Sequence, residues 1–309
     1  MALDPRRMLE LLRIAEHGSY SRAAAAQGVS QPALSNSIAT LERMLGVRLL
    51  ERGAQGASLT EYGRLLADHA TSLRSLLDRA AADIELRRRG LEGSLVIGAS
   101  PVACVELVPA ALARMKADTP NVTVFVHEKP DDELLSGLRS GDIDLVVSPA
   151  GLSNDPPDIE RAFLLRDHFA IAMRAQHPLS GCKSVTLRQL RGFPWAMPDP
   201  NTAMYRHIEL AFSAENEPWP AAIVSTNSIT AIKSLIMRTD FVTISSRSVM
   251  APEIAAGLLA AIAFRKRHFG RDIVLRRRRT RWSPLCELFG KHLRAVAGSV
   301  EAATAAHKP

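Results

Sequence analysis

Residues 18–60 contain two short helical patterns separated by a tight turn, with a Gly-containing hairpin at the end. The first pattern begins at Ser19, and Gly28 lies in the turn. Ser30 is a favourable N-cap for the second helix, because its hydroxyl can accept a bond from an unpaired N–H of the first turn. Apolar side chains then recur at helical spacing, at Leu34, Ile38, Leu41 and Leu45. This spacing predicts one buried stripe.

The polar side chains of the second helix lie away from that stripe. Gln31, Ser35 and Asn36 are near its beginning, and Pro32 is tolerated there because first-turn N–H groups have no intrahelical partner. Amides and hydroxyls can read base edges in a DNA major groove, and phosphates favour helix N-termini. We therefore expect these four residues to face a DNA groove. The alternative is a generic helix in a small bundle.

The arrangement resembles the winged helix-turn-helix of LysR-type transcriptional regulators. The matching pieces occur in the family's order and spacing: Gly18-Ser19, Ala23-Ala24, 30–35, Leu41-Glu42, Leu45-Gly46, 49–52, Leu59-Thr60 and Gly63. The sequence departs from the family pattern at three positions. Gln27 replaces an apolar residue, Leu50 replaces the common Phe, and Asn36 stands where Arg is frequent.

Three further residues of this segment are candidates for contact with the DNA backbone. Ser21 and Arg22 lie on the first helix, and Arg52 precedes the hairpin that resembles the family's wing. Arg52 is expected to contact phosphate or the minor groove. For Arg22 and Arg52, a solvated surface charge is the competing interpretation.

The next segment, 61–90, is predicted to be one long helix. It contains no Pro after Thr60, and apolar residues repeat every seven positions in two sets, Leu66, Leu73, Ala80 and Ala70, Leu77, Ile84. This pattern is typical of a helix–helix seam. The helix could pack on its own domain. Its place between two domain-sized segments favours pairing with a second subunit through Leu66, Leu73, Leu77 and Ile84.

The remainder alternates between strand and helix patterns. Strands are expected at 95–98, 122–126 and 143–147 with helices between them, and this order predicts parallel βαβ units. A second lobe begins near Arg166, with strands at 169–173, 223–226 and 242–244 and helices centred on Ile208 and Ile232. A strand at 273–275 and a helix at 284–296 are interpreted as a return to the first lobe.

Two α/β lobes joined by two crossovers resemble the periplasmic-binding-protein-like effector domain of the LysR family. The resemblance is carried by residues 94–100, 141–148 and 164–179 and by Ser283-Pro284, while 194–206 looks like the subgroup that regulates aromatic-acid and sugar catabolism. The predicted fold is therefore α/β, with an all-α winged helix-turn-helix (1–60), a linker helix (61–90) and a two-lobed effector domain (91–300). Lobe I comprises 91–165 and 265–300, and lobe II comprises 166–264.

The resemblance implies that a small molecule, expected to be anionic, binds between the lobes. Loops after strands and helix N-termini should line such a site. The candidates are Ser100, Pro101, Ser148, Asn201, Thr202, Asn227 and Ser228. Each could instead be only a helix cap.

Composition excludes several other classes. The chain has 309 residues, 47% of them apolar, and a formal net charge of +7, which suits an anionic partner but does not identify one. No signal peptide or membrane-spanning run is expected, so a cytoplasmic protein is predicted. The three cysteines are far apart, which disfavours disulfides, and Cys182 is interpreted as an apolar filler. No metal-ligand spacing, phosphate loop or hydrolase elbow occurs, so neither cofactor nor catalysis is expected.

The sequence is thus identified as a LysR-type regulator. The resemblance implies a homodimer or homotetramer that binds double-stranded operator DNA, responds to a small-molecule effector and contacts RNA polymerase. The alternative is a cytoplasmic two-lobed solute-binding protein or enzyme with a vestigial DNA-binding domain. The intact segment 30–35 argues against this alternative.

Overall fold

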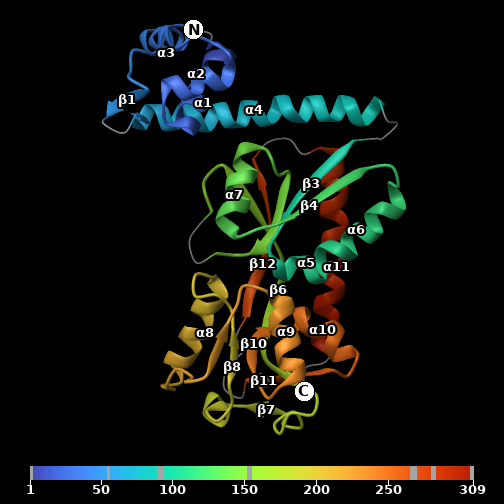
Figure 1. Ribbon diagram of the computed structural model, residues 1–309. Helices are drawn as coiled ribbons and strands as arrows, with labels where there is room; N and C mark the ends of the chain where they lie inside the picture. The colour runs from blue at the N-terminus through green and yellow to red at the C-terminus, as the bar shows by residue number, and fades with distance from the viewer. Residues whose placement is uncertain are drawn as a thin grey trace. The chain divides into compact units, whose positions relative to one another are not determined.

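The computed structural model describes residues 3–53, 56–88, 93–151, 155–264, 270–279 and 283–306 (Figure 1). The chain forms two compact units. One comprises residues 1–96, 121–125 and 132–144, and the other comprises 97–120, 126–131 and 145–309.

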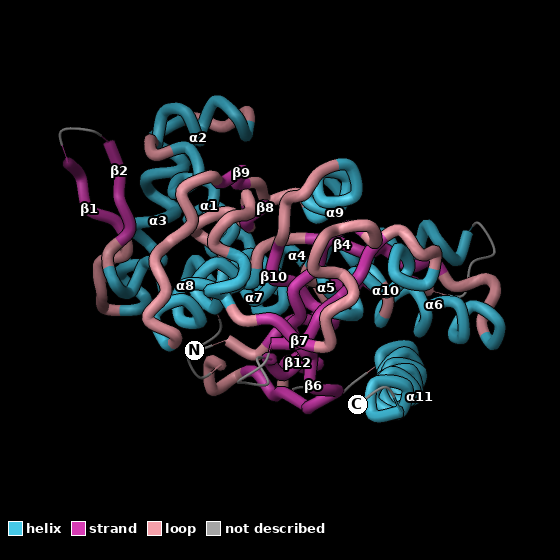
Figure 2. The backbone as a smooth tube through the Cα atoms, turned by 90° about the horizontal axis from the view of Figure 1, so that it is seen from below, coloured by secondary structure: helices cyan, strands magenta, loops and turns pink. Residues whose placement is uncertain are grey.

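The N-terminal part of the first unit is a helical bundle with a hairpin and a long helix. Its elements are α1 (Pro5–His17), α2 (Tyr20–Gln27), α3 (Gln31–Leu45), β1 (Leu50–Gly53), β2 (Gly56–Leu59) and α4 (Glu61–Arg88). The predicted helix pair, the hairpin and the long helix are confirmed, and α1 is additional to them. The hairpin pairs antiparallel from Leu50↔Leu59 to Gly53↔Gly56. It projects from the edge of the helices (Figure 2).

One apolar core holds this bundle together. Buried residues from α1 to α4 meet in it, including Leu11, Ile14, Leu34, Ile38 and Leu41. The predicted stripe of α3 is therefore confirmed, although Leu45 is only partly buried. Helices α2 and α3 end at glycines with positive φ, 66° at Gly28 and 72° at Gly46. Only glycine adopts this left-handed conformation without a steric penalty, so each helix turns sharply where the sequence places it.

The first lobe of the C-terminal part follows the predicted alternation. Its elements are β3 (Ser94–Ala99), α5 (Pro101–Val105), α6 (Leu107–Asp118), β4 (Thr123–Glu128), α7 (Asp131–Ser140) and β5 (Leu145–Pro149). Strands β3 and β5 are parallel, with Ile97 opposite Leu145. The predicted parallel βαβ arrangement is confirmed for this pair.

The second lobe contains more elements than the sequence predicted. They are β6 (Ile159–Arg174), β7 (Ser184–Val185), the 3-10 helix η1 (Leu187–Leu190), β8 (Trp195–Met197), α8 (Ala203–Ala214), β9 (Ile223–Ser225), α9 (Ile229–Arg238), β10 (Thr243–Ser246), α10 (Arg247–Ala255) and β11 (Leu259–Phe264). The chain then continues through β12 (Gly270–Arg278) and α11 (Pro284–Ala306). Strands β7, β8 and β11 were not predicted, because very short or uniformly apolar segments lack a clear period. Helix α10 was not predicted either, and it contains Pro252, a residue that normally argues against a helix.

Strands β6 and β12 are the two crossovers between the lobes. The main sheet has the order β4-β3-β5-β12-β6-β11-β7, and β10 also pairs with β6. Strands β6 and β12 run antiparallel over their whole shared length, from His168↔Gly270 to Ile159↔Arg278. Both are longer than the predicted 169–173 and 273–275, and the predicted lobe boundary at Arg166 falls inside β6. Polar residues at the ends of both strands interrupt the apolar pattern, so the sequence predicted strands that were too short.

Lobe II has its own apolar core, which places the loops after β8 and β9. Trp195 is 1% exposed and its ring meets that of Phe212 edge-on at 5.2 Å. Strands β8 and β9 are parallel, with Trp195 opposite Ile223. The two loops therefore leave the same edge of this small sheet.

Candidate DNA-binding and effector-binding sites

The first turn of α3 presents polar side chains to solvent. Ser30 caps the helix by accepting a bond from the Ala33 N–H at 3.3 Å, as predicted. Gln31, Pro32 and Asn36 are exposed, whereas Ser35 is half-buried. This exposed turn combines free first-turn N–H groups with amide and hydroxyl groups, which suits a DNA groove.

Helix α2 begins at the predicted cap. Ser19 accepts a bond from the Arg22 N–H at 3.5 Å, and the side chains of Ser21 and Arg22 are exposed. Gln27, where the family pattern has an apolar residue, is half-buried, and its amide donates to the Ala23 carbonyl at 3.2 Å. The polar group is thus satisfied within the helix. Arg52 lies on β1 opposite Ala57, and its side chain lies outside the described residues.

Helix α4 changes character along its length. Its first half belongs to the core of its own bundle, where Leu66 is 8% exposed, Ala70 is buried and Leu73 packs at the edge. Its second half exposes Leu77 by 51% and Ile84 by 64%. The predicted seam is therefore not uniform: Leu66 packs within the subunit, and Leu77 and Ile84 leave apolar surface uncovered.

In lobe I, the predicted residues gather at the ends of β3 and β5. The Ser100 N–H donates to the Val147 carbonyl at 3.0 Å, which places Ser100 beside the end of β5. The residue is 8% exposed, and its Oγ has no hydrogen-bond partner in the described part of the chain. Pro101 follows as the first residue of α5 and is half-buried.

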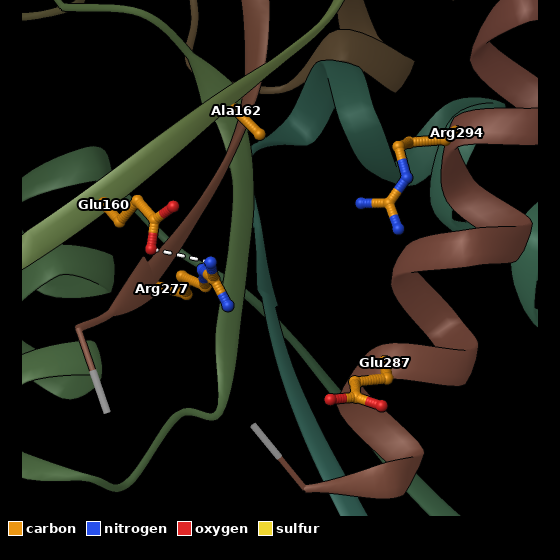
Figure 3. A pocket seen from close by; sticks show the side chains of 5 residues that line it. All are labelled: Glu160, Ala162, Arg277, Glu287 and Arg294. Carbon is orange, nitrogen blue, oxygen red and sulfur yellow. Dashed lines mark ion pairs between the residues drawn. The ribbon is translucent and has the colours of Figure 1, made fainter. Parts of the chain in front are cut away.

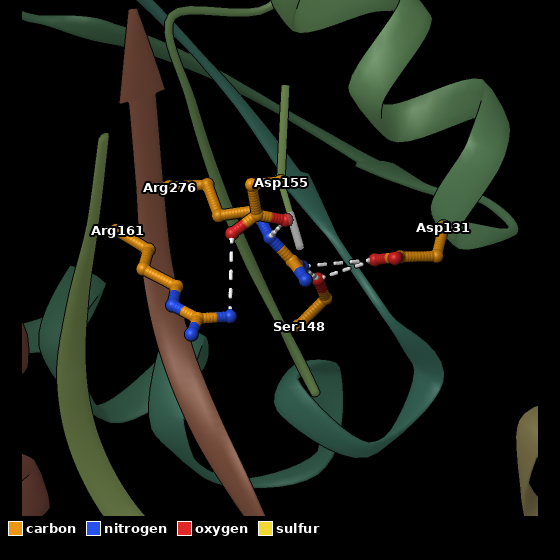
Figure 4. A network of polar contacts seen from close by, with 5 residues as sticks. All are labelled: Asp131, Ser148, Asp155, Arg161 and Arg276. Carbon is orange, nitrogen blue, oxygen red and sulfur yellow. Dashed lines mark hydrogen bonds and ion pairs between the residues drawn. The ribbon is translucent and has the colours of Figure 1, made fainter. Parts of the chain in front are cut away.

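Ser148 differs from the prediction, which had its hydroxyl open to a ligand. The residue is fully buried, its Oγ donates to Asp131 Oδ1 at 2.6 Å, and it accepts a bond from Arg276 (Figure 4). Arg276 also donates to Asp155 Oδ1 at 2.8 Å and to Asp131 Oδ1 at 3.1 Å. The Arg276 and Asp155 side chains are 1% and 8% exposed, whereas that of Asp131 is 42% exposed, so a buried ion pair and a partly exposed carboxylate surround this hydroxyl.

Sequence reasoning missed this network. Arg276 begins a run of four arginines, 276–279, and its partners lie 121 and 145 residues earlier. The one local signal was its position directly after the buried residues Val274 and Leu275. A charged residue that continues a buried strand needs buried partners.

In lobe II, the predicted residues cap two neighbouring helices. Thr202 Oγ1 accepts from the Tyr205 N–H at 3.2 Å and donates to the Asp199 carbonyl at 2.7 Å. Ser228 Oγ accepts from the Ala231 N–H at 3.2 Å. Asn201 and Asn227 precede these caps and are exposed.

The loops that carry these two caps are joined. The Thr226 N–H donates to the Met197 carbonyl at 3.0 Å, and Ser225 Oγ donates to the Pro198 carbonyl at 3.1 Å. The structure therefore brings the N-termini of α8 and α9 to one edge of lobe II.

A second buried polar cluster lies where the crossover strands meet β10. Asp167 on β6 accepts a bond from Ser246 on β10, and Arg271 Nε on β12 approaches its Oδ2 at 3.3 Å. The Arg271 guanidinium also lies 5.3 Å from the centre of the Phe169 ring. Burial raises the pKa of Asp167, and Arg271 and Ser246 oppose this rise. None of these residues was predicted.

Two further features have no predicted counterpart. A groove between β6, β12 and α11 is lined by Glu160, Ala162, Arg277, Glu287 and Arg294 (Figure 3). Arg277 lies 2.7 Å from Glu160 and lowers the pKa of that carboxyl. Burial, together with the neighbouring Glu128, raises the pKa of Cys104 to about 12, so this thiol stays protonated at neutral pH.

Searches for other site types gave negative results within the described ranges. No group of three or more His, Cys, Asp or Glu side chains there could hold a metal ion. No described helix has both the length and the apolar character needed to cross a membrane.

Two family models match almost the whole chain. The bacterial regulatory helix-turn-helix protein model of the lysR family matches residues 6–64, and the LysR substrate binding domain model matches residues 88–298. The chain belongs to the LysR family of transcriptional regulators. It combines the family's DNA-binding domain, α1 to the start of α4, with its effector-binding domain.

Individual LysR relatives agree with this assignment. The SDS degradation transcriptional activation protein of a Pseudomonas species is 34% identical over 265 residues, 84% of this chain and 84% of that protein. The regulator GbpR of Azospirillum brasilense is 27% identical over 253 residues, 82% of this chain and 74% of that protein.

Solved structures of similar proteins have the same fold. Full-length CbnR in complex with its target DNA superposes with a TM-score of 0.63 at 24% identity, covering 95% of this chain and 100% of that one. ArgP from Mycobacterium tuberculosis superposes with a TM-score of 0.67 at 17% identity, covering 96% and 98%. The predicted winged helix-turn-helix followed by a two-lobed effector domain is confirmed.

Proposed function

We propose that this LysR-type regulator binds operator DNA through the first turn of α3. The observation that carries this proposal is the exposure of Gln31, Pro32 and Asn36 on a helix whose opposite face is buried. Ser35, half-buried one turn after Gln31, contributes its hydroxyl at the edge of the same surface. Ser21 and Arg22 on α2 and Arg52 on the hairpin supply contacts to the DNA backbone.

The DNA-binding unit is a dimer. The apolar surface of Leu77 and Ile84 is available for the same helix of a second subunit, while Leu66 and Leu73 hold α4 to its own bundle. A two-fold pair of α3 helices would then read an inverted repeat. The assembly is this homodimer or a homotetramer of two such dimers, and the bound regulator contacts RNA polymerase.

A small molecule binds between the lobes and changes the regulator's response. In lobe I, Ser100 has a buried hydroxyl without a partner among the described residues, and Pro101 is its neighbour. In lobe II, Asn201, Thr202, Asn227 and Ser228 lie at two helix N-termini, whose N–H groups suit an anionic ligand. Ser148 contributes indirectly, because its hydroxyl holds the Asp131 carboxylate.

The regulator acts in the cytoplasm and catalyses no reaction. The alternative, a two-lobed solute-binding protein or enzyme with a vestigial DNA-binding domain, predicts only weak, non-specific binding to DNA. Fluorescence anisotropy with the DNA fragment upstream of its own gene separates the two. Binding to this fragment with at least a thousand-fold preference over a scrambled fragment supports the regulator. Equal binding to both fragments supports the alternative.

A further inference from the structure

Glu42 connects the recognition helix α3 to the base of the hairpin β1–β2. Its Oε1 accepts bonds from two successive backbone N–H groups, Leu49 at 2.7 Å and Leu50 at 3.2 Å. Leu50 is the first residue of β1, and its ladder partner Leu59 ends β2. One carboxylate oxygen on α3 therefore holds the point where the chain enters the hairpin.

The exit from the hairpin is held to the same point. The Thr60 N–H donates to the Leu49 carbonyl at 3.0 Å, and Thr60 Oγ1 donates to the Arg48 carbonyl at 2.7 Å. Thr60 Oγ1 also accepts from the Gly63 N–H at 2.9 Å. A Cβ added at Gly63 would lie 2.0 Å from the Leu49 oxygen, so only glycine permits this approach.

These contacts use both backbone polar groups of Leu49, whose side chain is 1% exposed. Its N–H bonds to Glu42 and its carbonyl bonds to Thr60. A hydrogen bond to an ionised carboxylate is roughly twice as strong as a neutral one. Bonds within the hairpin ladder join β1 to β2, whereas the Glu42 bonds join the hairpin base to α3.

We propose that Glu42 is a positioning residue for DNA recognition, which sets the hairpin relative to α3 so that both reach one DNA molecule. This proposal rests on the assignment of α3 and the hairpin to operator contacts. Glu42 itself is half-buried at the opposite end of α3 from Gln31 and Pro32, and it acts through the backbone of Leu49 and Leu50.

The sign of the effect of Glu42→Ala distinguishes positioning from simple charge. Removal of a carboxylate near DNA reduces repulsion of phosphates, so electrostatics alone predicts tighter binding. Loss of the hairpin position predicts the opposite. Because one lost phosphate contact lowers the salt slope by about 1, affinity should fall roughly five- to ten-fold at moderate salt.

The experiment compares full-length variants on the DNA fragment upstream of the gene. Hydroxyl-radical footprinting reports the hairpin contact, and dimethyl sulfate protection reports the major-groove contact of α3. For Glu42→Ala we expect loss of the hairpin footprint, retention of the major-groove protection, and the lower salt slope. Glu42→Gln keeps an acceptor oxygen at the same place and should stay within about two-fold of wild type. Glu51→Ala, an exposed carboxylate on β1, is the charge control and should bind at least as tightly as wild type.

A measurement made without DNA shows whether the variant is folded and whether the Glu42 contact is lost. Amide hydrogen exchange at Leu49 and Leu50 should accelerate in Glu42→Ala, while the buried amides of α1 keep wild-type protection. If Glu42→Ala does not fold, Thr60→Val disrupts the other side of the same contact and should lose the same footprint.

Two results would overturn the proposal. One is an unchanged hairpin footprint and salt slope in Glu42→Ala. The other is a Glu42→Ala variant that binds the fragment as tightly as wild type or more tightly, as loss of the charge alone predicts. If wild type protects neither groove of the fragment, the assignment of DNA contacts fails instead, and the exchange data alone decide whether Glu42 positions the hairpin.

Discussion

The DNA-binding domain and the effector-binding domain bury different kinds of side chains. Within residues 3–51 and 57–70, whose side chains the structure describes, no polar or charged side chain is buried, and the buried core residues are apolar. The effector-binding domain buries Ser148, Asp167, His177, Ser246 and Arg276. The first domain keeps its polar groups at the surface, where DNA can use them, and the second uses buried polar groups inside the fold.

This difference follows from how each domain is built. The bundle packs α1 to α4, which all lie within the first 88 residues, around an apolar core. The crossover strands β6 and β12 join segments more than a hundred residues apart. Buried charges with several partners hold these strands in one register, since a shifted strand would leave a charge unpaired. Each prediction below tests one side of this comparison.

The largest effect is expected for Arg276→Met. This change leaves Asp131, Asp155 and Ser148 without their shared donor. Removal of one partner from a buried ion pair costs about 3–5 kcal/mol of unfolding free energy. Urea unfolding of the full chain measures the loss.

The adjacent arginine is the matched control. Arg277 pairs with Glu160 at 2.7 Å, but the two side chains are 32% and 42% exposed. Arg277→Met should therefore cost less than about 1 kcal/mol. Equal losses for Arg276→Met and Arg277→Met would mean that the buried network does not stabilise the domain, and the comparison would fail on that side.

The next effect concerns the apolar surface of α4. The double variant Leu77→Asn, Ile84→Asn should make the free energy of dimerisation less favourable by about 3 kcal/mol. A fully buried side chain of this size contributes about 1.5–3 kcal/mol. Sedimentation equilibrium measures the dimer constant. The thermal stability of the bundle should not change, because both side chains lie outside its core.

Leu66→Ala gives the opposite pattern and completes that test. Leu66 is 8% exposed within the core of its bundle, so its truncation should destabilise the domain by about 2–5 kcal/mol. A Leu77, Ile84 double variant that remains a dimer would show that another surface joins the subunits.

The third prediction concerns the surface of α3. The substitution Ser35→Glu places a carboxylate beside DNA phosphates. It should weaken the binding free energy for the operator by at least about 2 kcal/mol, a roughly thirty-fold loss of affinity. Unfolding should change little, because no described contact of the Ser35 side chain is lost. Ser35→Ala is the size control. Wild-type affinity of Ser35→Glu across a salt titration would remove α3 from the DNA interface.

The same contrast explains what the sequence could predict. In the N-terminal domain, the caps Ser19 and Ser30 and the stripe of Leu34, Ile38 and Leu41 act within four residues of their partners or repeat at a helical period. Such local patterns are visible in sequence. The caps Thr202 and Ser228 of lobe II were predicted for the same reason.

The buried polar clusters could not be predicted in this way. The partners of Arg276 lie on α7, on β5 and before the start of β6, and those of Asp167 lie on β10 and β12, so no period links them. Glu42 stood in the family pattern, yet its role depends on the path of the chain after Gly46. Its bonds to Leu49 and Leu50 cannot be predicted without the position of the hairpin in the folded structure.

A smaller effect is expected at Thr202. Its hydroxyl caps α8, so Thr202→Val should lower the free energy of unfolding by about 1 kcal/mol. If the Thr202 hydroxyl also binds an anionic effector, the effector concentration for half-maximal reporter expression should rise about ten-fold. Thr202→Ser keeps the hydroxyl and should behave as wild type in both measurements. Lower stability with an unchanged induction curve would leave Thr202 as a helix cap only.

The smallest expected effect is a difference between the two domains in how their free energy of unfolding depends on pH. His177 is 2% exposed, its Nδ1 accepts the Leu179 N–H at 3.1 Å, and burial, aided by the charge of Arg174, lowers its pKa below the usual 6.5. As pH falls below 6.5, the unfolded chain takes up a proton that the folded domain resists. The free energy of unfolding of lobe II should therefore decrease, by at most about 1.4 kcal/mol per pH unit for one proton.

The test compares wild type with His177→Asn by denaturant unfolding between pH 7.5 and pH 5. Asn can keep an acceptor near the Leu179 N–H but does not titrate, so this variant should lose the part of the pH dependence due to His177. The N-terminal bundle, in whose core the described buried residues are all apolar, provides the internal comparison. Its unfolding, followed by hydrogen exchange of α1 and α3 amides, should depend less on pH over this range. An identical pH dependence in wild type and His177→Asn would mean that the folded domain accommodates the charged ring, and that burial of this polar group does not distinguish lobe II from the bundle.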